Sequence, residues 1–227
     1  MSGELLYLAS IWVLPAVIAI TLHEAAHGFA AYHLGDDTAW RLGRVSFNPL
    51  KHVDLFGTII MPALLLILRS PFLFGYAKPV PVNFRALRHP RRDMVLVAGA
   101  GPAINIALAT LAALLLHLIS YLPPVVATWV AQNLINAIII NVVLAVFNML
   151  PLPPLDGGRV AVGLLPDILA KPLAQLEPYG MMILLTLLLF LPMLGAQIGV
   201  DLNLMARLIT GPSETILSLI LRLTGND

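Results

Sequence analysis

The sequence predicts an all-α, multi-pass membrane protein with about five to six membrane helices, a re-entrant or interfacial segment and a small β-hairpin. Of its 227 residues 59% are hydrophobic and only 11% are charged, which is typical of a protein embedded in a bilayer. Several apolar stretches also approach the length of about 20 residues that a membrane span requires. The net charge of +1 gives no indication of a nucleic-acid partner. Because the chain has no cysteine, any metal must be held by nitrogen and oxygen ligands.

Five stretches are apolar enough to enter the membrane: about Leu5–Leu34, Leu55–Leu68, Asp93–Leu122, Ala131–Leu150 and Leu173–Leu194. The first follows an N-terminus without the positive charges of a signal peptide, so we expect it to be retained. The second is short and contains Gly57 and Pro62, which favours a re-entrant or interfacial segment covered by other helices.

The sequence leaves open whether the last part of the chain crosses the membrane. After Gly195, the stretch 216–223 contains Arg222 and could lie on the membrane surface or form a sixth span. We expect a single domain over residues 1–227, with a core at about 5–165 and C-terminal helices at 173–227.

The distribution of Lys and Arg predicts the orientation. The connections 34–53 and 69–92 are rich in these residues, whereas the N-terminus and the loop Tyr121–Val130 contain none. By the positive-inside rule both basic connections lie in the cytoplasm. The first and fourth of the stretches above, about Leu5–Leu34 and Ala131–Leu150, then both end on the cytoplasmic side of the membrane.

Residues 23–27 read His-Glu-Ala-Ala-His within the first apolar stretch. Two histidines four residues apart lie about 40° apart around a helix, so His23 and His27 can reach one ion. Imidazole nitrogen suits zinc, and Glu24 between them can act as a general base. A chance polar cluster near a helix end is the alternative. The cost of ionisable groups inside an apolar helix favours the functional interpretation.

A hydrolytic zinc site usually needs a third protein ligand. His33 has the spacing of the metzincin signature, but Ala30 stands where that signature has a helix-breaking Gly. On an unbroken helix, His33 would point about 240° away from His27. We therefore expect His33 to be a helix-end residue outside the site.

Asp156 is the better candidate for the third ligand. It follows the fourth apolar stretch, after a proline-rich turn and before Gly157. The alternative is a structural role as the N-cap of a short helix. Because the first and fourth apolar stretches end on the same side, the Asp156 carboxylate can lie at the depth of His27 and complete a site of two His and one Asp.

These motifs, in this order, resemble the site-2 protease family of intramembrane zinc metalloproteases, as a minimal member without PDZ or CBS domains. The segments that carry the resemblance are HEAAH at 23–27, Asn48–Thr58, Tyr76–Asn83, Gly99–Asn105 and PLPPLDGG at 151–158.

The resemblance implies an intramembrane endopeptidase in a cell (inner) membrane, with its active site toward the cytoplasm and a transmembrane helix of another membrane protein as substrate. It implies one Zn²⁺ per chain, held by His23, His27 and Asp156, with Glu24 as the catalytic base. The oligomeric state, including a homo-oligomer, stays open.

Four further polar residues have two interpretations each. Asn105 and Asn148 could contact a substrate carbonyl or the oxyanion, or could form structural hydrogen bonds between helices. His52 and Asp54 could line the entrance to the site, or could cap the short second stretch. Residues 76–83 alternate prolines with apolar residues, which predicts an extended edge strand of a small β-hairpin near the active site. Such strands are thought to pair with unwound substrate in the family.

Two other classes of function were weighed. A catalytically silent zinc-binding scaffold or transporter of the same fold is the main alternative, although no paired halves are visible in the sequence. A di-iron carboxylate enzyme would need a second Glu-x-x-His motif, and none of the other glutamates has a His three residues later.

Overall fold

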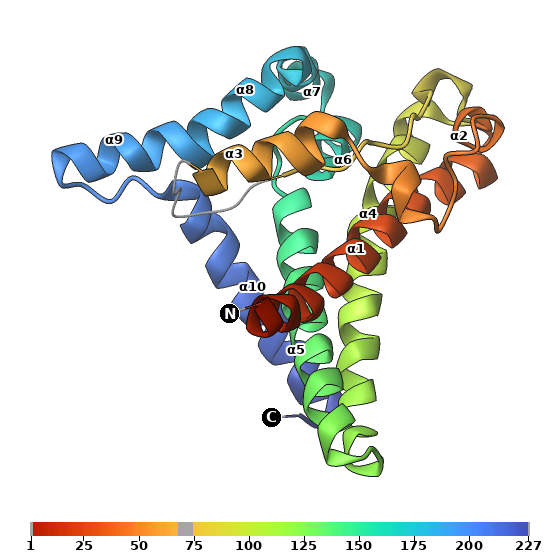
Figure 1. Cartoon of the computed structure of the whole chain (residues 1–227). Helices are drawn as coiled ribbons and strands as arrows, with labels where there is room; N and C mark the ends of the chain where they lie inside the picture. Colours follow the sequence, from red (N-terminus) through yellow and green to blue (C-terminus); the bar gives the residue numbers. More distant parts are fainter. Residues whose placement is uncertain (1, 68–74, 227) are drawn as a thin grey trace.

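The computed structural model describes residues 2–67 and 75–226, and these residues form helices, turns and extended segments without any β-strand (Figure 1). The α-helices are α1 Ser2–His33, α2 Thr38–Arg41, α3 Met61–Ile67, α4 Pro90–Leu116, α5 Pro124–Asn148, α6 Asp156–Leu164, α7 Asp167–Gln175, α8 Gly180–Leu185, α9 Leu191–Ile198 and α10 Leu204–Thr224. Short 3₁₀ or π-helical turns are η1 Pro49–His52, η2 Leu55–Ile60, η3 Phe84–Ala86, η4 Ile119–Tyr121, η5 Glu177–Tyr179 and η6 Thr186–Phe190.

The protein is a multi-pass membrane protein. Among the described residues, five helical stretches are long and apolar enough to cross a membrane, at residues 6–33, 90–116, 124–148, 167–198 and 204–224. The expected all-α class is therefore confirmed, with different helix ends. For example, α5 begins at Pro124 rather than near Ala131, because proline suits the first turn of a helix.

Helices α4, α5 and α10 pack together along their lengths, and α1 crosses against α4 and α5 (Figure 1). The main core contains three alanines of α4, namely Ala109, Ala112 and Ala113, against Val142 of α5 and Ile220 of α10. Small side chains let helix backbones approach closely, which is how helices associate where lipid removes the hydrophobic driving force. The C-terminal helix α10 is thus part of the helix bundle and is apolar enough to span.

The helical stretch from α8 to α9 extends away from this bundle (Figure 1). Many of its large apolar side chains are exposed, including Met182, Phe190 and Ile198. In water such a surface would be unfavourable, whereas in a bilayer it is solvated by lipid tails.

The expected β-hairpin is wrong for the residues that the structure describes. Residues 75–83 are extended but pair with no other strand. Two prolines in this segment, Pro79 and Pro81, have no N–H to offer a partner strand. Its remaining backbone donors are taken partly by side chains, since Glu24 and Asp36 each accept one.

The expected re-entrant segment is not supported either. Residues 55–67 form one short helix, η2 followed by α3, in which Met61 and Leu65 are buried. Most other large apolar side chains of this helix are exposed, so neighbouring helices do not cover it as a re-entrant path would require. Leu68, the expected end of the stretch, lies outside the described residues.

Candidate metal centre

The first two candidate ligands lie on α1, which continues without interruption through the motif. His23 and His27 are both buried, although they sit in a helix that is otherwise apolar. Their positions one turn apart bring the rings edge to face, with centroids 4.7 Å apart and the Nε2 atoms 3.1 Å apart. Both Nε2 atoms therefore face the same point, as a shared ion requires.

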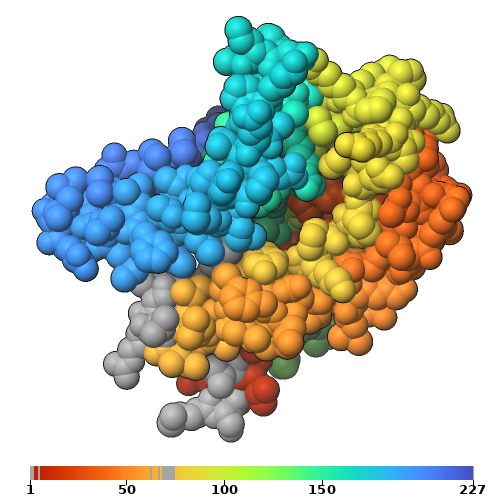
Figure 2. Space-filling view, turned by 90° about the horizontal axis from the view of Figure 1, so that it is seen from above, coloured from red at the N-terminus to blue at the C-terminus, as the bar shows by residue number. Residues whose placement is uncertain are grey.

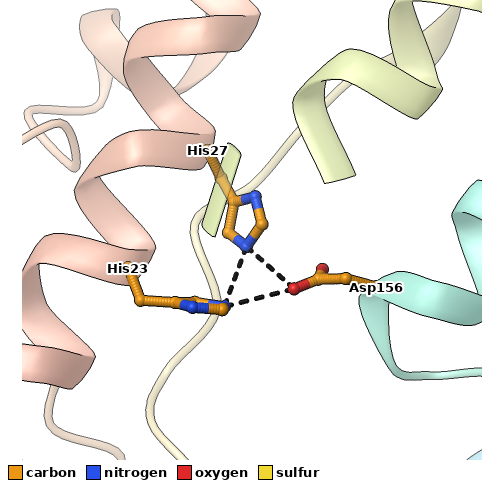
Figure 3. A group of neighbouring side chains, drawn as sticks. All are labelled: His23, His27 and Asp156. Carbon is orange, nitrogen blue, oxygen red and sulfur yellow. Dashed lines mark hydrogen bonds and ion pairs between the residues drawn. The ribbon is translucent and has the colours of Figure 1, made fainter. Parts of the chain in front are cut away.

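Asp156 brings the third candidate ligand from α6, which begins at this residue. Its Oδ2 lies 3.2 Å from Nε2 of His23 and 3.2 Å from Nε2 of His27. Figure 3 shows the two rings and the carboxylate converging from the two helices. Gly157 makes this approach possible, because a Cβ there would lie 2.2 Å from the backbone oxygen of Met149.

The three atoms fit a zinc ion. In a tetrahedral site with ligands at 2.0–2.1 Å, neighbouring ligand atoms are about 3.3 to 3.4 Å apart, close to the 3.1–3.2 Å found here. Burial alone would raise the pKa of the Asp156 carboxyl, but hydrogen bonds with His23 and His27 hold this pKa well below its usual range. A carboxylate at neutral pH is the form that binds a metal.

Gly101 of α4 leaves room for the ion. A Cβ at this position would come within 2.5 Å of Nε2 of His27 and within 2.6 Å of Nε2 of His23. Any larger residue would therefore press on both ligand nitrogens. In the sequence, Gly101 was noted only as part of the segment Gly99–Asn105 that carries the family resemblance.

The other nitrogen of each ring is also engaged. Nδ1 of His27 lies 2.8 Å from the backbone oxygen of Val97, and Nδ1 of His23 lies 2.5 Å from Oδ1 of Asn105. These oxygens accept hydrogen bonds from Nδ1, and in a neutral ring with its proton there the lone pair of Nε2 faces the centre, as zinc binding would require. Such outer partners usually accompany histidine ligands in metal sites.

Glu24 lies between the two histidines in sequence and is half-buried. Its Oε2 accepts the backbone N–H of Val80 over 2.7 Å. The extended segment 75–83 therefore runs directly beside the residue with the chemistry of a general base.

Except for Asn105, the other candidate residues form hydrogen bonds within their own local segment or lie away from the cluster. Asn148 donates from Nδ2 to the carbonyl of Leu144 in its own helix. His52 is buried with Nε2 2.8 Å from the carbonyl oxygen of Ser46. Asp54 caps η2, since its carboxylate accepts two backbone N–H groups there. His33 is exposed at the end of an unbroken α1, away from the cluster.

Asn105 contacts His23 but has no free donor for a substrate. It is completely buried, and its Nδ2 donates to Oδ1 of Asn141 over 2.7 Å and to the carbonyl of Ala19 over 3.4 Å. Sequence reasoning did not single out Asn141. The available signal was a polar amide in the middle of the very apolar α5.

Comparisons with known proteins agree with this centre. Residues 124–191, which include α5 and Asp156, match the family model of peptidase family M50. The chain is 42% identical over 190 residues to "Putative zinc metalloprotease YwhC" of Bacillus subtilis, covering 82% of each chain. It is 29% identical over 174 residues to "Putative zinc metalloprotease Rip2" of Mycolicibacterium smegmatis, covering 76% of this chain and 64% of that protein. With Rip2 of Mycobacterium tuberculosis H37Rv it shares 28% identity over 184 residues, covering 81% of this chain and 68% of that protein. No solved structure matches the chain.

Proposed function

Because the chain belongs to peptidase family M50, the site-2 protease family of zinc metalloproteases, we propose that it hydrolyses peptide bonds within or beside the transmembrane segments of other membrane proteins. One observation carries this proposal: the metal-binding cluster is buried between helices that are long and apolar enough to span a bilayer. A buried polar site in such a bundle suits a substrate that comes from the membrane rather than from water.

We assign His23, His27 and Asp156 as the ligands of one zinc ion. The distances among their ligand atoms, the room left by Gly101 and the engagement of both Nδ1 atoms support the assignment. When bound, zinc would supply Lewis-acid polarisation of the scissile carbonyl and activation of water at neutral pH.

Glu24 is the proposed catalytic base. It would take a proton from the attacking water and return it to the leaving amine, so that water is added across the C–N bond and the carboxylate is regenerated. The Val80 N–H would hold the carboxylate in one orientation while it does so.

The substrate must unwind locally, because the carbonyls of a transmembrane helix are hydrogen-bonded within the helix and shielded by side chains. The proposed site lies toward the end of the molecule that carries α2, α6 and α7. Figure 2 shows this end hollowed between α6–α7 and the segment that follows residue 75, with atoms of α1 at the floor of the hollow. The described parts of the two basic connections, residues 34–53 and 75–92, lie at the same end, so we propose that water reaches the site from the cytoplasm in a cell membrane.

The whole chain is proposed to form one domain, because Ile220 of α10 packs in the same core as α4 and α5. A silent zinc-binding scaffold or transporter remains the alternative function. Glu24 would be dispensable in such a protein, whereas here it is held beside the zinc ligands by a defined hydrogen bond.

The test is zinc content together with cleavage of a model transmembrane substrate, for wild type, Glu24→Gln and Asp156→Ala in detergent. We expect one zinc per wild-type chain, loss of cleavage in both variants and loss of zinc only in Asp156→Ala. Full zinc occupancy in Asp156→Ala would remove this residue from the site. Normal cleavage by Glu24→Gln would overturn its role as the base, and zinc binding without cleavage by wild type would favour the scaffold.

A further inference from the structure

We propose that Asn141 is a positioning residue that acts through Asn105 to hold His23 with its Nε2 ready for zinc. The inference rests on the zinc site proposed above and goes beyond it, since neither amide is a ligand. Asn141 lies in the apolar helix α5 and is only 2% exposed, and Asn105 of α4 is completely buried. Buried amides between membrane helices are costly unless all their groups are bonded, so the arrangement of these bonds is well defined.

The orientation of the network follows from two backbone carbonyls, that of Ala137 beside Asn141 and, at a longer distance, that of Ala19 beside Asn105. The oxygen of Ala137 can only accept, so the side-chain nitrogen of Asn141, 2.8 Å away, must face it. Oδ1 of Asn141 then faces Asn105 and accepts from Nδ2 of that residue over 2.7 Å. The carbonyl of Ala19 lies on the same side, 3.4 Å from Nδ2. Oδ1 of Asn105 is thereby left facing His23.

This orientation determines the state of the His23 ring. Oδ1 of Asn105 lies 2.5 Å from Nδ1 of His23 and accepts its proton. In the neutral ring Nε2 is then unprotonated and carries the lone pair that a metal requires. If the Asn105 amide were reversed, an NH₂ group would face Nδ1, the proton would move to Nε2, and His23 could no longer bind zinc through that atom.

The two histidines differ in this respect. Nδ1 of His27 bonds to the backbone oxygen of Val97, which no side-chain substitution removes. Nδ1 of His23 bonds instead to the side-chain amide of Asn105. The oxygen and the NH₂ group of this amide have nearly the same shape, but the oxygen accepts a hydrogen bond and the NH₂ group donates one. Asn141 distinguishes these two groups, and His23 is therefore the ligand that is sensitive to it.

Asn136 provides a matched control on the same helix. It is also 2% exposed, and its Nδ2 donates to the carbonyl of Ile11 in α1 over 2.7 Å. Its bond joins α5 to α1, without any link to a proposed metal ligand among the described contacts. Replacing Asn136 by Leu should lower stability as the loss of a buried interhelical hydrogen bond does, but should leave zinc affinity unchanged.

The experiment measures zinc affinity by chelator competition in the full-length protein in detergent. Asn141→Leu should weaken zinc binding by roughly 10- to 100-fold, which is typical for the loss of an outer partner of a metal ligand. In Asn141→Asp a protonated carboxyl donates its O–H to the Ala137 carbonyl and accepts from Asn105 through its other oxygen, so it should restore most of the affinity. Equal affinities for Asn141→Leu and Asn136→Leu would overturn the proposal.

A double substitution separates positioning from packing. In Asn105→Asp either end of the side chain can accept from His23, and a proton on the end that faces Asn141 and Ala19 donates to them, so no orienting partner is needed. Adding Asn141→Leu to Asn105→Asp should therefore change zinc affinity little, whereas adding it to wild type should cause the full loss. An equal loss in both backgrounds would show that Asn141 acts through packing and would contradict the inference.

Nitrogen chemical shifts of ¹⁵N-labelled histidine give a second measurement that needs neither zinc nor activity. In zinc-free wild type Nδ1 of His23 should carry a proton, whether or not Nε2 also carries one toward Asp156, and Asn141→Leu should lower the protonation of Nδ1. His23→Ala separates the two proposals, because unchanged zinc affinity in that variant would mean that the proposed zinc site itself is wrong. Loss of zinc in His23→Ala with no effect of Asn141→Leu would refute only the positioning role.

Discussion

Val80 donates its backbone N–H to the carboxylate of Glu24 over 2.7 Å, so the extended segment 75–83 and the proposed catalytic base are directly connected. Arg44 holds the same segment from the other side, because its Nη2 donates to the carbonyls of Lys78 and Pro79. The orientation of Glu24 therefore depends on contacts made well outside the metal centre.

Arg44→Ala should lower kcat without removing zinc. Loss of the two bonds loosens the segment that orients Glu24, and small displacements of a catalytic group reduce rates on the order of 10-fold or more. Zinc content and cleavage rate should be measured together. Arg41→Ala is the control, since Arg41 is exposed and its bonds go to Asp37. A kcat for Arg44→Ala equal to that of the control would show that the segment does not orient the base.

Gly101→Ala should abolish zinc binding and cleavage. The added Cβ would lie 2.5 Å from Nε2 of His27, where a histidine bound to a metal has no freedom to move away. Gly99→Ala is a matched control on the same helix, because its Cβ would meet nothing within 4 Å. Zinc analysis of both proteins checks the prediction, and normal zinc content in Gly101→Ala would contradict the proposed position of the ion.

His33→Ala should retain zinc and activity, whereas His27→Ala should lose both. His33 is exposed at the end of α1, and His27 is buried in the cluster. The loss for His27→Ala should exceed the roughly 10- to 100-fold that removal of an outer partner costs. Reduced zinc affinity in His33→Ala would instead require a rearranged ligand set.

Removal of zinc by a chelator should lower thermal stability, because the ion would join α1 to α6. Binding only to the folded state contributes roughly 2.7 kcal/mol when free zinc is at about 100 times its Kd. Unfolding of the protein in detergent, followed with and without chelator, measures this difference. Asp156→Ala should show no response to the chelator, and an equal response would place the stabilising zinc elsewhere.

The metal centre could be predicted from sequence because its parts leave local signals. The spacing of His23 and His27 on a helix is a geometric fact, and the charge pattern indicated that Asp156 lies at a similar depth. Asn141 leaves only the signal of a polar amide in an apolar helix, because its role depends on which carbonyl, amide and ring meet between three helices. Only the three-dimensional arrangement shows that its bond to Ala137 determines the orientation of Asn105.

The extended segment 75–83 shows a second reason why the sequence alone did not predict the whole structure. Alternating prolines in 75–83 predicted an edge strand, and the backbone is indeed extended. A strand also needs a partner with complementary donors and acceptors, and here side chains and single carbonyls from α1 and residues 52–57 take that place. The location of α10 was left open for a related reason, because Arg222 suggested a surface helix while packing of Ile220 places it in the bundle.

The wide separation of the ligands along the chain has a consequence for biosynthesis. His23 and Asp156 are 133 residues apart, and a ribosome makes them in that order. While α1 and α4 enter the membrane, the chain carries two imidazoles and a potential base but no carboxylate to complete the centre. With the ligand set proposed above, the nascent protein could not yet hold zinc in a complete site, and hydrolytic capacity would arise only after Asp156 has been translated and α6 has docked.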